Sequence, residues 1–176
     1  LLINKTLDSQ HDTVTDDFFV RRYNADGSPD ASFGAGGTVV RDVFFNQFDS
    51  LSDILIQPDG KILALGRTAP NSPTDAGDVA LIRLNPNGTL DTTFSGDGRL
   101  SQTLGGDDKG IQLALRSDGD ILVTATSTAA GHAFALLRYN ANGTLDTALD
   151  GDGILYHTYG SAIAVQPSDN KVLVYD

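Results

Sequence analysis

One phrase recurs three times along the chain, and it restricts the fold more than any other feature of the sequence. It reads RYNADGSPDASFGAGG at 22–37, RLNPNGTLDTTFSGDG at 83–98 and RYNANGTLDTALDGDG at 138–153. The arginines that open the three copies lie 61 and 55 residues apart. A second phrase also recurs, as ILIQPDGKILALG, LALRSDGDILVTA and AIAVQPSDNKVLVYD. A period of this length is typical of repeated supersecondary units that stack on one another.

The segments between the glycine-rich phrases are typical of strands. KILALG, DILVTA and KVLVYD are short, rich in Ile, Leu and Val, and bounded by turn-forming residues. DVALIRLN and AFALLRYN are nearly continuous apolar runs, which is the pattern of a strand covered on both faces. No stretch shows sustained helical periodicity. The sequence therefore predicts an all-β fold.

Tight turns connect the predicted strands. In QPDG at 57–60, Pro presets φ for the second turn position and Gly takes the left-handed position. RSDG at 116–119 is the same turn without Pro. QPSDNK at 166–171 is one residue longer, and we expect Asn170 to take the left-handed position there.

Four short antiparallel strands per repeat indicate β-propeller blades. We treat residues 1–176 as a single repeat domain with complete blades at 50–104 and 110–159. Residues 1–45 then supply the last three strands of one blade, and 161–176 the first two strands of another. The strand before each hairpin turn is expected to lie innermost, since Ala114, Ala162 and Ala164 suit a crowded centre.

About three blades' worth of strands cannot close a ring that needs about four to eight blades. We therefore expect the chain to be a fragment, or a part of a larger ring. The rest of a larger polypeptide, or a second copy of the chain, would complete that ring. The absence of Met also leads us to expect a processed chain or a piece of something longer.

Composition excludes several classes of partner. The formal net charge is −11, from 12 basic and 23 acidic residues, which argues against nucleic acid and anionic membrane surfaces. No apolar run approaches the roughly 18 residues of a membrane span, so membrane insertion is not expected. The chain has no Cys, hence no disulfide or thiolate chemistry.

The two recurring phrases together resemble the delta-60 repeat, a bacterial repeat family predicted to form β-propellers. The resemblance covers essentially the whole chain in three copies. It implies a part of a long secreted or surface-associated bacterial protein, and no activity defines the family. The third copy departs from the pattern, because Leu149 stands where the others have Phe33 and Phe94.

The glycine-rich phrase is expected to build structure. Asn first and Gly fourth is the signature of a type I turn, and the Asp three residues after the Gly lies within reach of the Arg. The phenylalanine then anchors the loop to its blade. The structural motif consists of Arg22, Asn24, Gly27 and Asp30, of Arg83, Asn85, Gly88 and Asp91, and of Arg138, Asn140, Gly143 and Asp146.

Calcium is the alternative reading of this phrase. The third, fifth and sixth positions of a D-x-[DN]-x-[DN]-G loop match Asn24, Asp26 and Gly27, but the first ligand position holds an arginine, which repels a cation. Asp146, Asp150 and Asp152 place three carboxylates on one loop, which we expect to be a solvated turn. A calcium site at these three acids is the alternative, and no other cofactor is expected.

No catalytic constellation is evident. His11, His132 and His157 are scattered without metal-binding spacing, and no Ser lies in a G-x-S-x-G elbow. We expect a non-catalytic structural or interaction module of a larger secreted or cell-surface bacterial protein, with a protein or a glycan as ligand. The alternatives are a propeller enzyme acting on an extracellular polymer, as a glycan hydrolase or lyase, and a calcium-dependent adhesive module.

Overall fold

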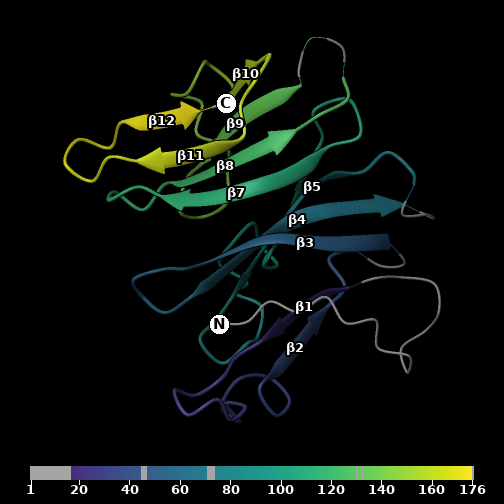
Figure 1. Cartoon of the computed structure of the whole chain (residues 1–176), viewed down its shortest axis with the longest axis vertical. Coiled ribbons are helices and arrows are strands. Elements are labelled where there is room, and N and C mark those ends of the chain that lie inside the picture. Colours follow the sequence, from purple (N-terminus) through teal and green to yellow (C-terminus); the bar gives the residue numbers. More distant parts are fainter. Residues whose placement is uncertain (1–16, 45–46, 71–73, 130, 132, 176) are drawn as a thin grey trace.

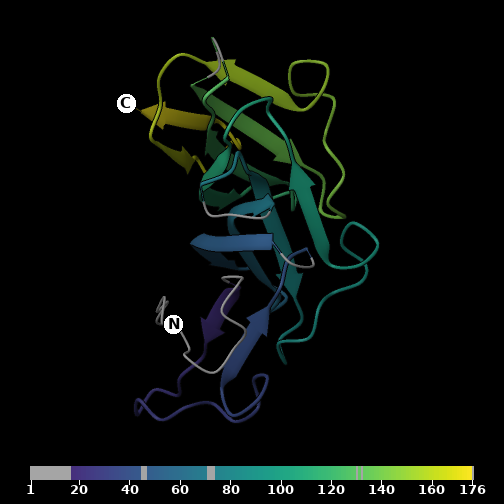
Figure 2. The same cartoon turned by 90° about the vertical axis from the view of Figure 1, so that its right-hand side faces the viewer.

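Four antiparallel sheets follow one another along the molecule in the computed structural model, which describes residues 17–44, 47–70, 74–129, 131 and 133–175 (Figures 1 and 2). The described residues form twelve strands and no helix. Within them, nothing forms a helix long and apolar enough to cross a membrane. The all-β expectation is confirmed.

The first complete sheet is a four-stranded meander in the order β3-β4-β5-β6. Its strands are β3 (Gln47–Ile56), β4 (Ile62–Pro70), β5 (Asp78–Leu84) and β6 (Arg99–Gln102). The predicted 57–60 turn joins the first two strands, since the backbone N–H of Gly60 donates to the Gln57 carbonyl at 2.9 Å. The sheet begins three residues before the predicted blade start, because β3 stays paired with β4 out to Pro70.

The second complete sheet repeats the same order and contains β7 (Lys109–Leu115), β8 (Ile121–Thr126), β9 (Phe134–Tyr139) and β10 (Ile154–His157). Both sheets carry a register irregularity at the same place in their first strand. It lies between Leu51 and Asp53 in β3, and between Gly110 and Gln112 in β7. A shared bulge of this kind bends the first strand alike in both sheets.

A two-stranded sheet lies at each end of this pair. β1 (Phe18–Arg21) pairs with β2 (Thr38–Arg41), and β11 (Ala162–Val165) pairs with β12 (Val172–Tyr175). The third strand that we predicted within 1–45 would fall in residues 1–16, outside the described residues. In the last hairpin Asn170 has φ 57°, so the predicted left-handed position is confirmed.

The faces of the sheets pack on one another and divide the core into layers. Leu63 and Leu65 of β4 face the second complete sheet, where they pack with Val123 and Leu137. The alternate residues of β4, Ile62 and Ala64, face the β1–β2 sheet. Side chains of a strand alternate between its faces, so both faces of β4 are buried. This explains the nearly continuous apolar runs of the sequence.

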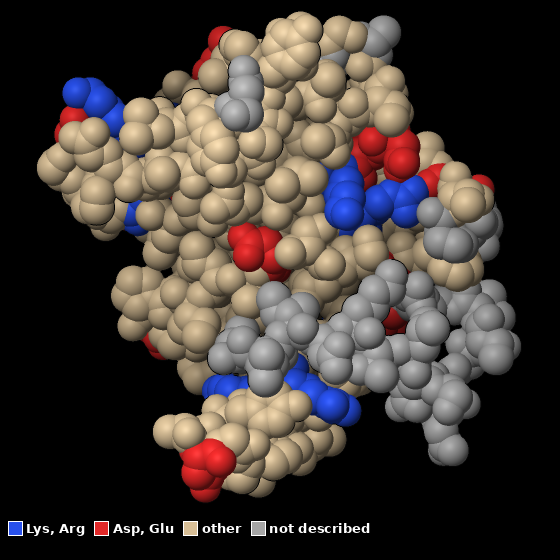
Figure 3. All heavy atoms as spheres, viewed as in Figure 1, with Lys and Arg blue, Asp and Glu red and all other residues tan. Residues whose placement is uncertain are grey.

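The first strands of successive sheets lie side by side. β7 contacts β3 on one side and β11 on the other (Figure 1). Charged side chains lie around these strands in small groups on the face drawn in Figure 3, several of them with acidic and basic residues together. The excess of acid does not form one continuous patch on that face.

Candidate functional site

An arginine at the end of the third strand organises each glycine-rich loop, and Arg83 has the most buried position of the three. Its Nε donates to Asp91 Oδ2 at 2.7 Å, with both side chains at most 6% exposed. Its Nη2 donates to Thr93 Oγ1 at 3.2 Å, and its guanidinium carbon lies 4.7 Å from the ring centre of Phe94. The single guanidinium thus ties the acid and the phenylalanine of the motif together.

The remaining guanidinium nitrogen of Arg83 reaches the next repeat. Its Nη1 donates to the backbone carbonyl of Ala141, in the turn of the following glycine-rich phrase. Beside it, the backbone N–H of Ser95 donates to the Asn142 carbonyl at 2.8 Å. The ring of Phe94 lies against Gly143, where an added Cβ would come within 2.9 Å of the ring. The phrase therefore joins neighbouring sheets as well as stabilising its own loop.

The first repeat makes the same set of contacts. Arg22 Nε donates to Asp30 Oδ2 at 2.8 Å, its Nη2 donates to Ser32 Oγ at 2.9 Å, and its guanidinium lies over Phe33. Its Nη1 donates to the Pro86 carbonyl, which corresponds to Ala141 one repeat later. This pair is more exposed than the second, at 25% and 23% for its two side chains.

The third repeat keeps the ion pair, with Arg138 Nε 2.6 Å from Asp146 Oδ2. Leu149 takes the place of the phenylalanine and packs instead near the Leu122 and Ile163 layer of the core. The predicted contact between the arginine and the carboxylate of its own loop is thus present in all three repeats.

The asparagine and glycine of the motif close the turn as the sequence indicates. Gly88 has φ 88° and its N–H donates to the Asn85 carbonyl at 2.8 Å. The Asn85 side chain donates to Thr89 Oγ1 at 3.0 Å and to the Leu90 carbonyl at 3.1 Å. Asn24 with Gly27, and Asn140 with Gly143, form the same turn.

The electrostatics differ between the second and third repeats. Burial alone would raise the pKa of Asp91, but hydrogen bonds from Thr93 and Lys61 and the charge of Arg83 hold this pKa well below its ordinary value. Lys61 Nζ lies 3.0 Å from Asp91 Oδ2. The position of Lys61 is taken in the next repeat by Asp120, whose pKa is raised by burial and by the charges of neighbouring acids. Lys61 therefore forms a second ion pair with Asp91, whereas the pKa of Asp146 is lowered by the Ala148 N–H and by the charges of Arg138 and Arg116.

The three acids suggested as a calcium site are not brought together. Asp146 is engaged by Arg138 and by the backbone N–H of Ala148, and Asp152 accepts the Ile154 N–H at 2.9 Å. Within the described part of the chain, one group of three acids has ligand oxygens within 4.8 Å of one another, and it consists of Asp17, Asp42 and Asp49. Asp146 and Asp152 each accept the backbone N–H two residues ahead, and this local bonding turns their carboxylates toward their own loop.

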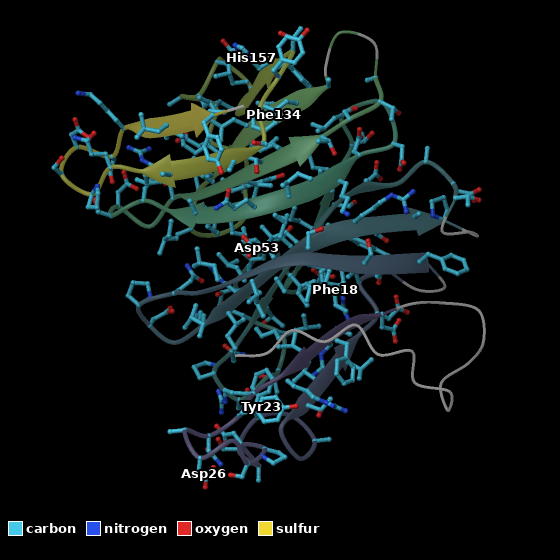
Figure 4. The ribbon with its side chains drawn as sticks, in the orientation of Figure 1. Phe18, Tyr23, Asp26, Asp53, Phe134 and His157 are labelled. Atoms are coloured by element: carbon cyan, nitrogen blue, oxygen red, sulfur yellow. The ribbon has the colours of Figure 1, made fainter. Side chains whose placement is uncertain are left out.

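The histidines do not form a site in the part of the chain that the structure describes. His157 is exposed at the end of β10, where it pairs with Phe134 of β9 (Figure 4). His11 and His132 lie outside the described residues. One hollow beside the first loop is lined by Arg21, Arg22 and Tyr23 together with proline, threonine and glycine residues, and it contains no acid or nucleophile pair.

A family comparison assigns this geometry to a known group. The family model described as "domain of unknown function (DUF5122) beta-propeller" matches residues 13–33, 57–94 and 116–148. These segments amount to more than half of the chain. The chain belongs to this β-propeller family. No curated protein matches it.

Each matched segment of this DUF5122 propeller ends at, or one residue before, the position of Phe33, Phe94 or Leu149. The Arg–Asp pair and the Asn–Gly turn therefore lie inside every match. The hairpin turns at 57–60 and 116–119 open the second and third matches. The family signature coincides with the residues that join the sheets to one another.

Sequence reasoning missed a second set of junctions in this DUF5122 propeller, between the first strands of successive sheets. Asp53, labelled in Figure 4, accepts the Leu113 N–H on Oδ2 at 2.7 Å. Gln112 Oε1 accepts the Ile163 N–H at 2.9 Å. Asp53 and Gln112 occupy equivalent positions just after the bulge of β3 and β7. The signal that could have found them is a polar residue at one fixed position of an otherwise apolar strand.

Proposed function

We propose that this β-propeller domain is a non-catalytic structural or interaction module of a larger secreted or cell-surface bacterial protein. One observation carries the proposal: the repeated polar phrase is occupied by contacts within and between sheets. Arg83 alone contacts its own acid, its own phenylalanine and the next turn. Charged groups engaged in this way are not free to bind or transform a substrate.

The resemblance to the delta-60 repeats supports the proposed extracellular or cell-surface location. The two recurring phrases resemble that bacterial family, whose members resemble parts of long secreted or surface-associated proteins. We therefore propose an extracellular or cell-surface location. The ligand of the complete ring would be a protein or a glycan, with no nucleic acid involved. The acidic net charge of −11 is in keeping with the last point.

Exposed apolar residues in the terminal sheet support the completion of the ring by further blades. In β12, Leu173 is 61% exposed, Val174 41% and Tyr175 65%. The corresponding strand β8 is almost entirely buried between two sheets. We propose that another blade covers this sheet, supplied by the rest of a larger polypeptide or by a second copy of the chain.

Light scattering on the chain alone, and on a polypeptide extended by its flanking repeats, tests this assembly. A mass of twice 18.6 kDa for the chain alone identifies a second copy as the partner. A monomer that gains unfolding free energy in the extended polypeptide identifies the flanking blades. A monomer whose stability is the same with and without the flanking sequence contradicts ring completion.

A pair of surface variants makes the assembly test specific. Leu173→Glu lies in the terminal sheet and should weaken whichever association is found. Ile56→Glu is the matched control, because Ile56 is similarly exposed, at 57%, but ends the first strand of a complete sheet. The non-catalytic part is tested separately with extracellular glycans, from which the protein should release no soluble sugar above a buffer blank. Sugar release would contradict it.

A further inference from the structure

Three acids from different strands converge beside the β1–β2 sheet. Asp17 directly precedes β1, Asp42 directly follows β2, and Asp49 lies in β3. One carboxylate oxygen of each lies within 4.8 Å of the other two. Phe18, the neighbour of Asp17 that Figure 4 labels between β1 and β3, marks the region. The cluster therefore lies at the junction of two sheets and not on an open loop.

Asp42 and Asp49 each have a buried carboxylate oxygen that accepts no hydrogen bond among the described residues. Asp49 is 2% exposed, and its Oδ2 accepts the Val43 N–H at 2.7 Å. Its Oδ1 is buried and accepts no hydrogen bond of normal geometry, although the Thr68 hydroxyl lies close enough to favour the charged carboxylate. Oδ1 of Asp42 is also buried and without a hydrogen bond among the described residues. A buried carboxylate oxygen in this state is costly unless a cation or a proton joins it.

Basic side chains in the described part of the chain form no ion pair with two of the acids, Asp42 and Asp49. Arg99 donates to the backbone carbonyl of Asp42 at 3.4 Å rather than to its carboxylate. Burial raises the pKa of Asp49 to about 7. The nearby Thr68 hydroxyl and the Val43 N–H oppose this rise, and the charges of Asp42 and Asp17 add to it.

We propose that Asp17, Asp42 and Asp49 bind a calcium ion that joins the β1–β2 sheet to β3. The donors are all carboxylate oxygens, which suit a hard divalent cation. Two oxygens on opposite sides of Ca²⁺ lie roughly 4.6–5.2 Å apart, because each Ca–O distance is about 2.3–2.6 Å. Oxygens within 4.8 Å of one another therefore fit around that ion. Mg²⁺, with distances of about 2.0–2.1 Å, requires a tighter set.

The next junction of the same chain supplies an internal comparison. Asp108 corresponds to Asp49, is fully buried, and its Oδ2 accepts the Leu104 N–H at 2.5 Å. The position of Asp42 is taken there by Thr103. At both junctions an aspartate, Asp49 or Asp108, therefore accepts the backbone N–H that follows the neighbouring sheet. A carboxylate at the position of Asp42 is present only at the first junction. We expect the calcium site at the first junction alone.

Calorimetry and thermal unfolding of the cation-free chain test the proposal. Titration with CaCl₂ up to about 10 mM, which covers weak extracellular sites, should give saturable binding and a rise in the melting temperature. Asp42→Asn should weaken binding by at least about tenfold, because the charge of the ligand set falls. This variant retains the Asp49 hydrogen bond to Val43, so it should still fold.

Two further measurements distinguish a calcium ligand from an acid with a structural role only: a matched variant, and the sign of the change in melting temperature with and without calcium. Asp78→Asn, at the position of the second junction that corresponds to Asp17, should bind calcium as the parent does. Without calcium, Asp42→Asn should melt at a higher temperature than the parent, because carboxylate repulsion is relieved; with saturating calcium it should melt lower. Absence of saturable binding, binding unchanged in Asp42→Asn, or a larger response to MgCl₂ than to CaCl₂ would overturn the proposal.

Discussion

Asp53 of β3 accepts a hydrogen bond from the backbone N–H of Leu113 in β7, with 2.7 Å between Oδ2 and N. This hydrogen bond links the first strands of the two complete sheets. Oδ1 of the same carboxylate accepts the Ile54 N–H at 2.8 Å. One side chain thus satisfies a backbone donor in each of two sheets, at the point where a bulge has interrupted the ladder of β3.

Loss of this carboxylate should leave both donors unsatisfied. We expect Asp53→Ala to lower the free energy of unfolding by about 2–3 kcal/mol, since each orphaned, partly buried N–H costs about 1–3 kcal/mol before water relieves it. Asp53→Asn keeps one acceptor oxygen and should lose about half as much. Urea denaturation measures both. Equal losses for the two variants would contradict a role for the acceptor atoms.

Replacement of Arg83 should leave the buried Asp91 carboxylate without its main partner and so lower the free energy of unfolding. We expect Arg83→Gln to lower the free energy of unfolding by about 3 kcal/mol, at the lower end for a broken buried pair because Lys61 still lies beside Asp91. Arg22→Gln is the control, and the loss of its more exposed pair should cost less than about 1 kcal/mol. Urea denaturation should therefore rank the two variants clearly, and similar losses would show that burial does not govern the motif.

The ion pair between Arg83 and Asp91 should also affect how the free energy of unfolding changes at acidic pH. The folded-state pKa of Asp91 is lowered, so its stabilising contribution is complete above the ordinary value of 3.8 and is lost as the pH falls below it. The parent and Asp91→Asn should therefore differ in unfolding free energy at about pH 5 and converge toward pH 2. Asp150→Asn is the control, since Asp150 is exposed and takes part in no hydrogen bond or ion pair among the described residues. A constant difference across this range would contradict the assignment.

Gly143 tests the contact between neighbouring sheets. Its φ is 89°, and an added Cβ would lie 2.9 Å from the ring of Phe94. Gly151 has the same φ with nothing within 4 Å of such a Cβ. Gly151→Ala should therefore cost only the backbone strain of about 1–2 kcal/mol, and Gly143→Ala a further 1–3 kcal/mol or so for overpacking. Thermal unfolding compares the two variants. Equal decreases in melting temperature would mean that the contact between Gly143 and Phe94 accommodates the extra methyl group without loss of stability.

Substitution of Tyr139, unlike the substitutions above, is not expected to lower the free energy of unfolding. It is 2% exposed, and its hydroxyl oxygen is buried without a hydrogen bond among the described residues. Tyr139→Phe removes this polar atom and leaves the ring in the core, so we expect unfolding free energy to be unchanged or higher by up to about 1 kcal/mol. Tyr156→Phe serves as a comparison at a more exposed tyrosine. A loss above about 1 kcal/mol for Tyr139→Phe would reveal a partner for the hydroxyl.

Much of the fold could be predicted because its causes are local. The apolar runs of β4 and β5 indicate strands with two buried faces, and Leu63 and Ala64 do enter opposite layers of the core. Gly88 and Asn170 take left-handed conformations as the turn sequences require. Asp91 lies eight residues after Arg83 on a loop too short to separate them, so the ion pair follows from the sequence as well.

Contacts between sheets could not be predicted, because they depend on the angle and offset at which one sheet packs on the next. The sequence alone determined that Arg83 meets Asp91, but only the tertiary structure placed its third nitrogen on the Ala141 carbonyl, 58 residues away. The same holds for Asp53 and Leu113, which are separated by 60 residues. Asp146, Asp150 and Asp152 are close in sequence and do not form a group of ligands, whereas Asp17 converges with Asp42 and Asp49 although it lies 25 residues before Asp42. Proximity along the chain governs turns and ion pairs, while convergence of side chains is decided by how the sheets stack.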